Sequence, residues 1–172
     1  LFAQPSADDY DYAAVALQSG IWGTWWFEYL NWGGRFFSVI LIALFTGYEH
    51  WQQFYFLAPF FLLGSQYAAF FLLLSVATKR LALKLSAPKL FLLTSVSFAV
   101  YFLAVLNPAQ VFYWVAGGMT YSFANTATVL AIALLFWPQL RPGREALLLG
   151  ALSAATLMVV GCNEVAGVLL DL

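Results

Sequence analysis

The chain has 172 residues, of which 63% are hydrophobic and 9% are charged, and its net charge is −1. Its mean hydropathy is +0.84, whereas soluble domains carry about 25% charged residues. The composition therefore predicts a polytopic membrane protein built from α-helices and excludes a soluble globular domain. No basic face remains for nucleic acid once the lysines and arginines are assigned to loops, so a nucleic-acid partner is not expected.

The sequence predicts that residues 5–47 form a polar and aromatic region at the outer surface of the membrane. Residues 5–19 have helical spacing of apolar positions, and Ser6, Asp8 or Asp9 is suited to cap a helix at its start. The polar positions along this helix favour an orientation in the interface rather than across the bilayer.

Two glycines, Gly20 and Gly23, interrupt this helical pattern. Residues 21–32 are rich in tryptophan, a ring type that settles at headgroup depth. The apolar run at 36–47 is too short for a crossing of about 20 residues. We expect a second interfacial or half-inserted helix there, and a short tilted crossing stays open.

Four later segments have the length and composition of membrane crossings. The predicted transmembrane helices are residues 54–78, 89–107, 117–137 and 145–164. Six of the seven basic residues fall in two loops between them, and such loops face the cytoplasm. These residues are Lys79, Arg80, Lys84, Lys89, Arg141 and Arg144. On this topology Asp8 and Asp9 lie on the outer face, which in a bacterial inner membrane is the periplasmic side.

The ends of the chain lack the marks of a complete membrane protein. Leu1 is not preceded by a signal-peptide pattern, and the sequence stops in the apolar run 165–170. We interpret residues 1–172 as a single membrane domain and a fragment of a longer chain that begins near the outer end of a missing first span.

The carboxylates near the ends of predicted helices are candidate catalytic groups. Asp8 and Asp9 could supply a general base or bind a divalent cation, or they could simply cap a helix with negative charge at the positive end of its dipole. Glu164 follows Asn163 at the end of a span, where an ionisable group is costly unless it is paired or functional.

Arg35, Asn163 and two aromatic residues are candidate substrate-binding groups. Arg35 could clamp a phosphate, or it could anchor the interface or pair with Glu28 or Asp11. Trp114 and Tyr121 could stack on a sugar ring, or they could belong to an interfacial aromatic belt.

Metal and redox sites have little support. His50 has no second His or Cys at ligand spacing. Cys162 is the single cysteine, so no intramolecular disulfide can form.

Four short motifs are spread along nearly the whole chain. They are Ala7-Asp8-Asp9-Tyr10, Trp32-Gly33-Gly34-Arg35, Phe112-Tyr113-Trp114 with Gly117 and Tyr121, and Gly161-Cys162-Asn163-Glu164. This set resembles a bacterial family of multi-spanning membrane proteins of unassigned function, which in turn looks like part of the GT-C glycosyltransferase superfamily.

The resemblance implies an enzyme that uses polyprenyl-phosphate sugars on the outer face of the membrane. By this resemblance, Asp8 or Asp9 would take the proton of the acceptor hydroxyl or hold a divalent cation. We assign the proton transfer to Asp9, with Asp8 as a hydrogen-bonding or metal partner. Arg35 would match the arginine of a Trp-x-Gly-Arg type motif and hold the phosphate, although Gly33 replaces the more usual polar residue. Glu164 would match the acid of an Asn-Glu motif.

Two other functions remain open from the sequence. The chain could be a non-catalytic structural or accessory subunit that contacts other membrane subunits, with its carboxylates acting as helix caps. A transporter fragment would instead carry ionisable groups in mid-span or an inverted repeat, and the sequence shows neither.

Overall fold

The chain folds into a bundle of helices. The computed structural model describes residues 3–31, 33–137 and 145–163, and every regular element within those ranges is a helix. Four helical stretches in this part of the chain are long and apolar enough to cross a membrane: Trp51–Arg80, Ala87–Ala104, Val115–Leu135 and Glu145–Cys162. The prediction of an all-α polytopic membrane protein is confirmed.

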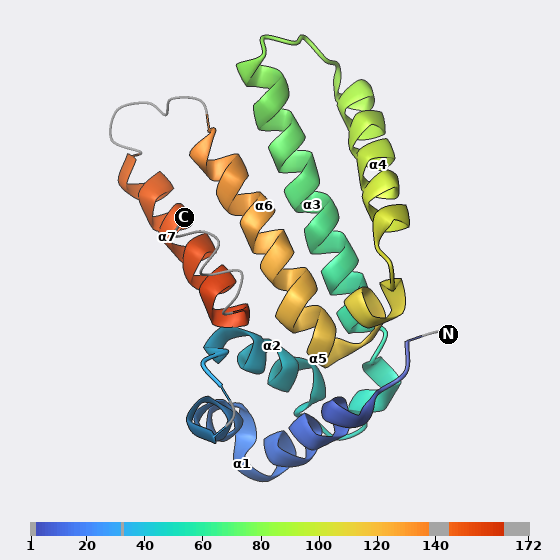
Figure 1. The fold of residues 1–172 in the computed structure, drawn as a ribbon, viewed down its shortest axis with the longest axis vertical. Coiled ribbons are helices and arrows are strands. Elements are labelled where there is room, and N and C mark those ends of the chain that lie inside the picture. The colour runs from blue at the N-terminus through green and yellow to red at the C-terminus, as the bar shows by residue number, and fades with distance from the viewer. Residues whose placement is uncertain (1–2, 32, 138–144, 164–172) are drawn as a thin grey trace.

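The long helices lie side by side, and the two N-terminal helices cover one end of them (Figure 1). Helices α3 (Leu57–Arg80), α4 (Ala87–Ala104), α6 (Phe123–Leu135) and α7 (Glu145–Cys162) form the bundle, in which α6 packs between α3 and α7. Helices α1 (Ala7–Asn31) and α2 (Phe36–Thr46) lie at the end opposite to the turn between α3 and α4.

Short helical turns connect these elements at the covered end. A 3₁₀ helix, η1 (Trp51–Phe54), leads into α3. Two π-helical segments, η2 (Ala109–Tyr113) and η3 (Gly118–Ser122), flank the short helix α5 (Val115–Gly117) before α6 begins. The hydrophobic core is concentrated here, because buried residues of all these elements pack together.

Helix α2 lies across the end of the bundle. Its eleven residues extend about 16 Å at 1.5 Å per residue, about half of the thickness of a hydrocarbon core. Three stacked rings join it to the bundle, with Phe37 and Phe61 on either side of Phe123 and centroid distances of 5.9 and 5.6 Å. A short helix therefore forms where the apolar run 36–47 predicted one.

Helix α1 bends sharply at Gly20, as the sequence indicated. Gly20 has φ of 70° and ψ of 174°, a backbone conformation that is almost restricted to glycine. The bend turns the aromatic second half of α1 back toward α2, and the side chains of Trp22 and Trp26 remain 71% and 56% exposed. Rings exposed at this end of the bundle suit the membrane interface.

At the opposite end of the bundle, Arg80, the last residue of α3, forms hydrogen bonds to the chain that follows α6. Its guanidinium donates from Nε to the carbonyl of Phe136 at 2.8 Å and from Nη2 to the carbonyl of Trp137 at 2.9 Å. These carbonyls follow the end of α6 and have no partner further along that helix. Arg80 therefore joins the ends of α3 and α6.

Gly20→Ala tests the bend in α1. We expect a loss of about 1–3 kcal/mol in the free energy of unfolding, because a side chain is strained in this conformation, measured by thermal unfolding in detergent. Gly64→Ala is the matched control, because an added Cβ meets nothing within 4 Å at either position. Gly64 lies inside α3, where alanine should add about 0.5–1 kcal/mol. Equal effects of the two substitutions would contradict the role of the bend.

Candidate functional site

Asp9 caps the helix in which it lies. The Ser6 backbone N–H donates to Asp9 Oδ2 at 2.9 Å, and the Asp9 backbone N–H donates to the Ser6 carbonyl at 2.9 Å. Ser6 precedes the first residue of α1, so Asp9 occupies the third helical position of a capping-box arrangement. The capping alternative foreseen from the sequence therefore applies to Asp9.

The same carboxylate also reaches a second helix start, more than a hundred residues away. Asp9 Oδ1 accepts the Ala116 backbone N–H at 2.9 Å, and Oδ2 accepts the Tyr55 hydroxyl at 2.7 Å. The Tyr55 hydroxyl oxygen in turn accepts the Val115 backbone N–H at 3.0 Å. The first two N–H groups of α5 are thus satisfied by side chains of α1 and of the segment that leads into α3.

Asp9 has no exposed surface. Burial raises the pKa of its carboxyl, and the hydrogen bonds from Ser6, Tyr55 and Ala116 oppose that rise. Since both oxygens are occupied by donors and neither faces solvent, the side chain is placed for structure rather than for contact with a substrate.

Asp8, the neighbouring carboxylate, faces a small pocket. The pocket has a volume of about 120 Å³ and is formed by three parts of the chain that are far apart in sequence. It is lined by Asp8, Tyr12, Arg35, Trp114, Ala116, Gly117, Thr120 and Tyr121. Four residues selected from the sequence, Asp8, Arg35, Trp114 and Tyr121, are therefore brought together. The volume suits a group the size of a phosphate rather than a whole substrate, since complete ligand pockets are usually about 300–1,000 Å³.

Arg35 gives this pocket a positive charge. It is half-buried at the start of α2, and in the described ranges its guanidinium forms no hydrogen bond or ion pair. The Arg35 charge also acts on Tyr12: burial and Glu28 raise the pKa of Tyr12 to about 12, and Arg35 opposes that rise. A guanidinium left unpaired beside a cavity is suited to bind an external anion.

Trp114 forms one wall of the pocket because Gly117 allows its ring to approach. A Cβ at Gly117 would collide with the Trp114 ring. The indole Nε1 of Trp114 is buried and has no hydrogen-bond acceptor in the part of the chain that the structure describes. Tyr121, by contrast, is 48% exposed at the pocket's edge.

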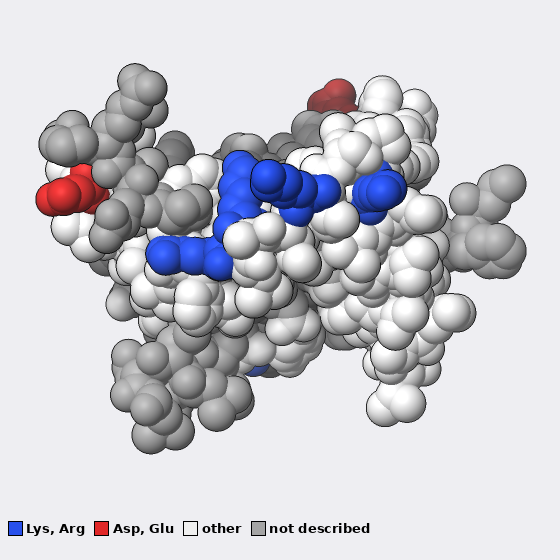
Figure 2. All heavy atoms as spheres, turned by 90° about the horizontal axis from the view of Figure 1, so that it is seen from above, with Lys and Arg blue, Asp and Glu red and all other residues white. Residues whose placement is uncertain are grey.

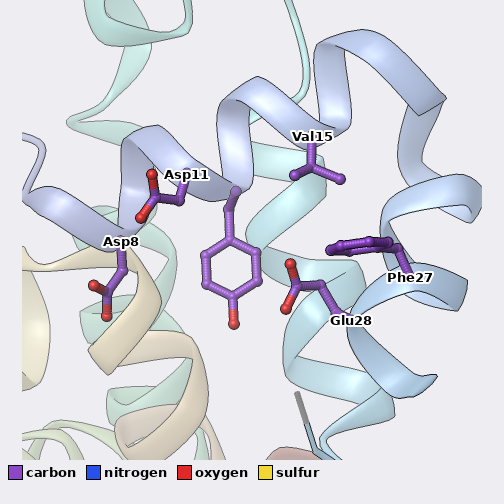
Figure 3. A pocket seen from close by; sticks show the side chains of 6 residues that line it. Asp8, Asp11, Val15, Phe27 and Glu28 are labelled. Carbon is purple, nitrogen blue, oxygen red and sulfur yellow. The ribbon is translucent and has the colours of Figure 1, made fainter. Parts of the chain in front are cut away.

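A second, acidic pocket shares a wall with the first. It measures about 280 Å³ and is lined by Asp8, Asp11, Tyr12, Val15, Phe27 and Glu28. Figure 3 shows that Asp8, Asp11 and Val15 come from the first half of α1, whereas Phe27 and Glu28 face them from the second half. The bend at Gly20 creates this pocket. Asp8 and Tyr12 line both cavities.

The pKa of Glu28, which lines the acidic pocket, is raised above its ordinary value. Burial raises the pKa of its carboxyl, and the nearby Asp11 carboxylate raises it further. Across the described ranges, no three His, Cys, Asp or Glu side chains are grouped so as to hold a metal ion.

The end of α7 approaches the same region. A Cβ on Gly161 would lie 2.6 Å from a ring carbon of Phe36, the residue after Arg35. Asn163, a predicted substrate-binding residue, follows α7 and donates its backbone N–H to the carbonyl of Val159 at 3.0 Å. Glu164, the third predicted catalytic acid, lies outside the described residues.

Sequence reasoning missed Tyr55 and Tyr12. Tyr55 was included only as part of an apolar segment, although its hydroxyl stands between Phe54 and Phe56 in a run of phenylalanines. That single hydroxyl among rings without polar atoms is the signal that could have marked it. Tyr12 gave no comparable signal, because its place between two pockets depends on the fold.

Comparison with known proteins assigns the chain to no family. No protein-family model, curated protein or solved structure matches the chain. The functional inference therefore depends on the chemistry and geometry of the two pockets.

Asp9→Asn should destabilise the fold, whereas Asp8→Asn should not. An amide at position 9 replaces one acceptor by a donor, so at least one of the three donors that Asp9 accepts from loses its partner, at a cost of about 1–3 kcal/mol where that donor is buried. Asp8 is exposed, and its substitution should change stability by less than about 0.5 kcal/mol. Chemical unfolding of both variants in detergent measures the difference. Equal stabilities would refute the capping role of Asp9.

Proposed function

We propose that the chain is part of a membrane glycosyltransferase of the GT-C type, which transfers a sugar from a polyprenyl-phosphate carrier to an acceptor hydroxyl. The observation that carries the proposal is the convergence of Asp8, Arg35, Trp114 and Tyr121 on one pocket. Together they supply a carboxylate, a cation that forms no ion pair with any residue that the structure describes, and aromatic rings.

Each group has a part in the proposed reaction. Arg35 holds the phosphate of the carrier through charge-assisted hydrogen bonds and stabilises the charge that develops on it. Asp8 accepts the proton of the acceptor hydroxyl while the oxygen attacks the anomeric carbon. The bond between that carbon and the phosphate oxygen breaks, and polyprenyl phosphate leaves with the bonding electrons.

Asp8 is preferred to Asp9 as the base. From the sequence we expected Asp9 to take the proton of the acceptor hydroxyl. A base, however, must come within hydrogen-bond reach of the proton that it removes. Asp8 lines both pockets, whereas Asp9 is buried behind three hydrogen bonds. We therefore assign Asp9 to positioning: it fixes the start of α5, which forms one wall of the pocket.

The two pockets provide separate places for the two substrates. We assign the phosphate to the pocket beside Arg35 and the acceptor to the acidic pocket, because the two cavities meet at Asp8 and Tyr12. An apolar groove of about 470 Å³ between α3 and α6 is suited to part of the prenyl chain. Its lining includes Phe61, Ala69, Phe123 and Leu130.

The proposed enzyme works in a bacterial inner membrane with its pockets on the periplasmic side. The pockets lie at the end of the bundle formed by α1 and α2, and the turn with Lys79, Arg80 and Lys84 lies at the other end (Figure 1). Basic loops face the cytoplasm, which supports this orientation.

Asp8→Asn and Arg35→Lys test the reaction. With a panel of polyprenyl-phosphate sugars and membrane lipid extract as acceptor source, Asp8→Asn should lower kcat about 10²- to 10⁴-fold. Arg35→Lys should raise the KM for the donor about ten- to a hundredfold, as expected when a charged hydrogen bond is lost. Glu49→Gln is the control, because Glu49 is exposed and lines neither pocket. Full transfer by both test variants would refute the proposal and favour an accessory subunit.

Sidedness is tested by labelling Ser6→Cys and Lys84→Cys in intact cells with a membrane-impermeant maleimide. The native Cys162 is buried and should not react. We expect the Ser6→Cys protein to be labelled and the Lys84→Cys protein to be labelled only after the membrane is permeabilised. Labelling of both without permeabilisation would contradict the proposed orientation.

A further inference from the structure

Four cationic side chains gather at the turn between α3 and α4. Figure 2, which views the molecule from this end, shows Lys and Arg side chains clustered on one face. Lys79 and Arg80 close α3, Lys84 lies in the turn, and Lys89 lies in the first turn of α4. All four are exposed.

Three of these cations form no ion pair with the residues that the structure describes. Arg80 is engaged with the carbonyls that follow α6. Within residues 3–31, 33–137 and 145–163, however, Lys79, Lys84 and Lys89 form no ion pair. Lys89 also lies near the positive end of the α4 dipole, where a cation is unfavourable. An external anion would relieve both effects.

The same turn exposes a row of leucines. Leu81, Leu83 and Leu85 are 69%, 53% and 39% exposed, and they alternate with Ala82 and Lys84. Exposed leucines beside unpaired lysines form a surface that is apolar and cationic at once.

The backbone of this turn is fixed by hydrogen bonds. The Leu83 N–H donates to the Thr78 carbonyl at 2.9 Å, and the Ala82 N–H donates to the Lys79 carbonyl at 3.2 Å. Ala82 has φ of 54°, so the end of α3 has the geometry of a Schellman motif. The leucines are therefore held outward by an ordered turn.

We propose that the α3–α4 turn is a binding surface for anionic phospholipids. Lys79, Lys84 and Lys89 contact the phosphate headgroups, while the leucines of the turn insert among the upper parts of the acyl chains. Juxtamembrane clusters of lysine and arginine attract anionic leaflets in this way.

The position of the turn favours a lipid over an acidic protein as the partner. One candidate span ends at Arg80 and the next begins at Ala87, so residues 81–86 lie at the level where hydrocarbon gives way to headgroups. A soluble acidic segment would neutralise the lysines but would leave the leucines in water. This inference concerns the end of the bundle away from the two pockets and does not depend on the proposed transfer reaction.

Lipid selectivity tests the proposal. The full chain is reconstituted in vesicles of equal phosphatidylglycerol and phosphatidylcholine, extracted in mild detergent, and the bound lipids are quantified by mass spectrometry. We expect the bound ratio of phosphatidylglycerol to phosphatidylcholine to exceed one. The triple variant Lys79→Gln, Lys84→Gln, Lys89→Gln should lower that ratio about fivefold or more, from the attraction per lysine near an anionic surface.

Two controls separate charge from loss of structure. The matched triple Lys→Arg variant keeps the charges and should retain the ratio of the unaltered protein, and circular dichroism checks that both triple variants remain helical. An unaltered protein without selectivity, or a Gln variant with undiminished selectivity, would overturn the proposal.

Insertion of the leucines is tested separately. Leu83→Cys is labelled with a polarity-sensitive dye, which the buried Cys162 should not bind. In vesicles that contain phosphatidylglycerol, we expect blue-shifted emission that lipids brominated near the headgroup quench. Emission typical of water would refute insertion.

Discussion

The carboxylate of Asp9 is the interaction on which the pocket end of the molecule depends. It accepts hydrogen bonds from the start of α1, from Tyr55 and from the start of α5. The first N–H groups of a helix have no partner within it, and a buried carboxylate is costly unless donors surround it. The carboxylate accepts hydrogen bonds from the N–H groups at the helix starts, and these donors in turn stabilise its buried charge. As a result, the segment that carries Trp114 and Gly117 is held against the first half of α1, and the small pocket forms between them.

The two adjacent acids have different environments because consecutive residues of a helix point about 100° apart. Asp9 faces the core and has no exposed surface, whereas Asp8 is exposed and borders both cavities. An acidic pair can thus serve structure with one member and remain available for chemistry with the other. The bend at Gly20 completes the arrangement, since it brings Glu28 to face Asp11 across the larger pocket.

The parts of this fold that local sequence determines could be predicted, and the parts that distant contacts determine could not. Apolar length was sufficient to indicate the helical membrane bundle, and Gly20 marked the break in α1. The grouping of Asp8 with Arg35 and Trp114 followed from topology, because polar segments at the same end of a bundle meet. The sequence could not show which of Asp8 and Asp9 is buried. That depends on hydrogen bonds to Tyr55 and Ala116, which lie 46 and 107 positions after Asp9.

Hydrogen bonds at three levels connect α3 and the residues next to it with the helical stretch that begins at Val115. Tyr55 bonds to Val115 at one end, Thr126 donates to Gln66 at 2.6 Å in the middle, and Arg80 holds Phe136 and Trp137 at the other end. Between α3 and α4, by contrast, Tyr67 and Ser95 share one hydrogen bond amid aromatic contacts. Sliding of α3 along α6 would break all three connections at once, so the two helices are held in register. A displacement of α4 would leave these three connections intact, because none of them involves α4.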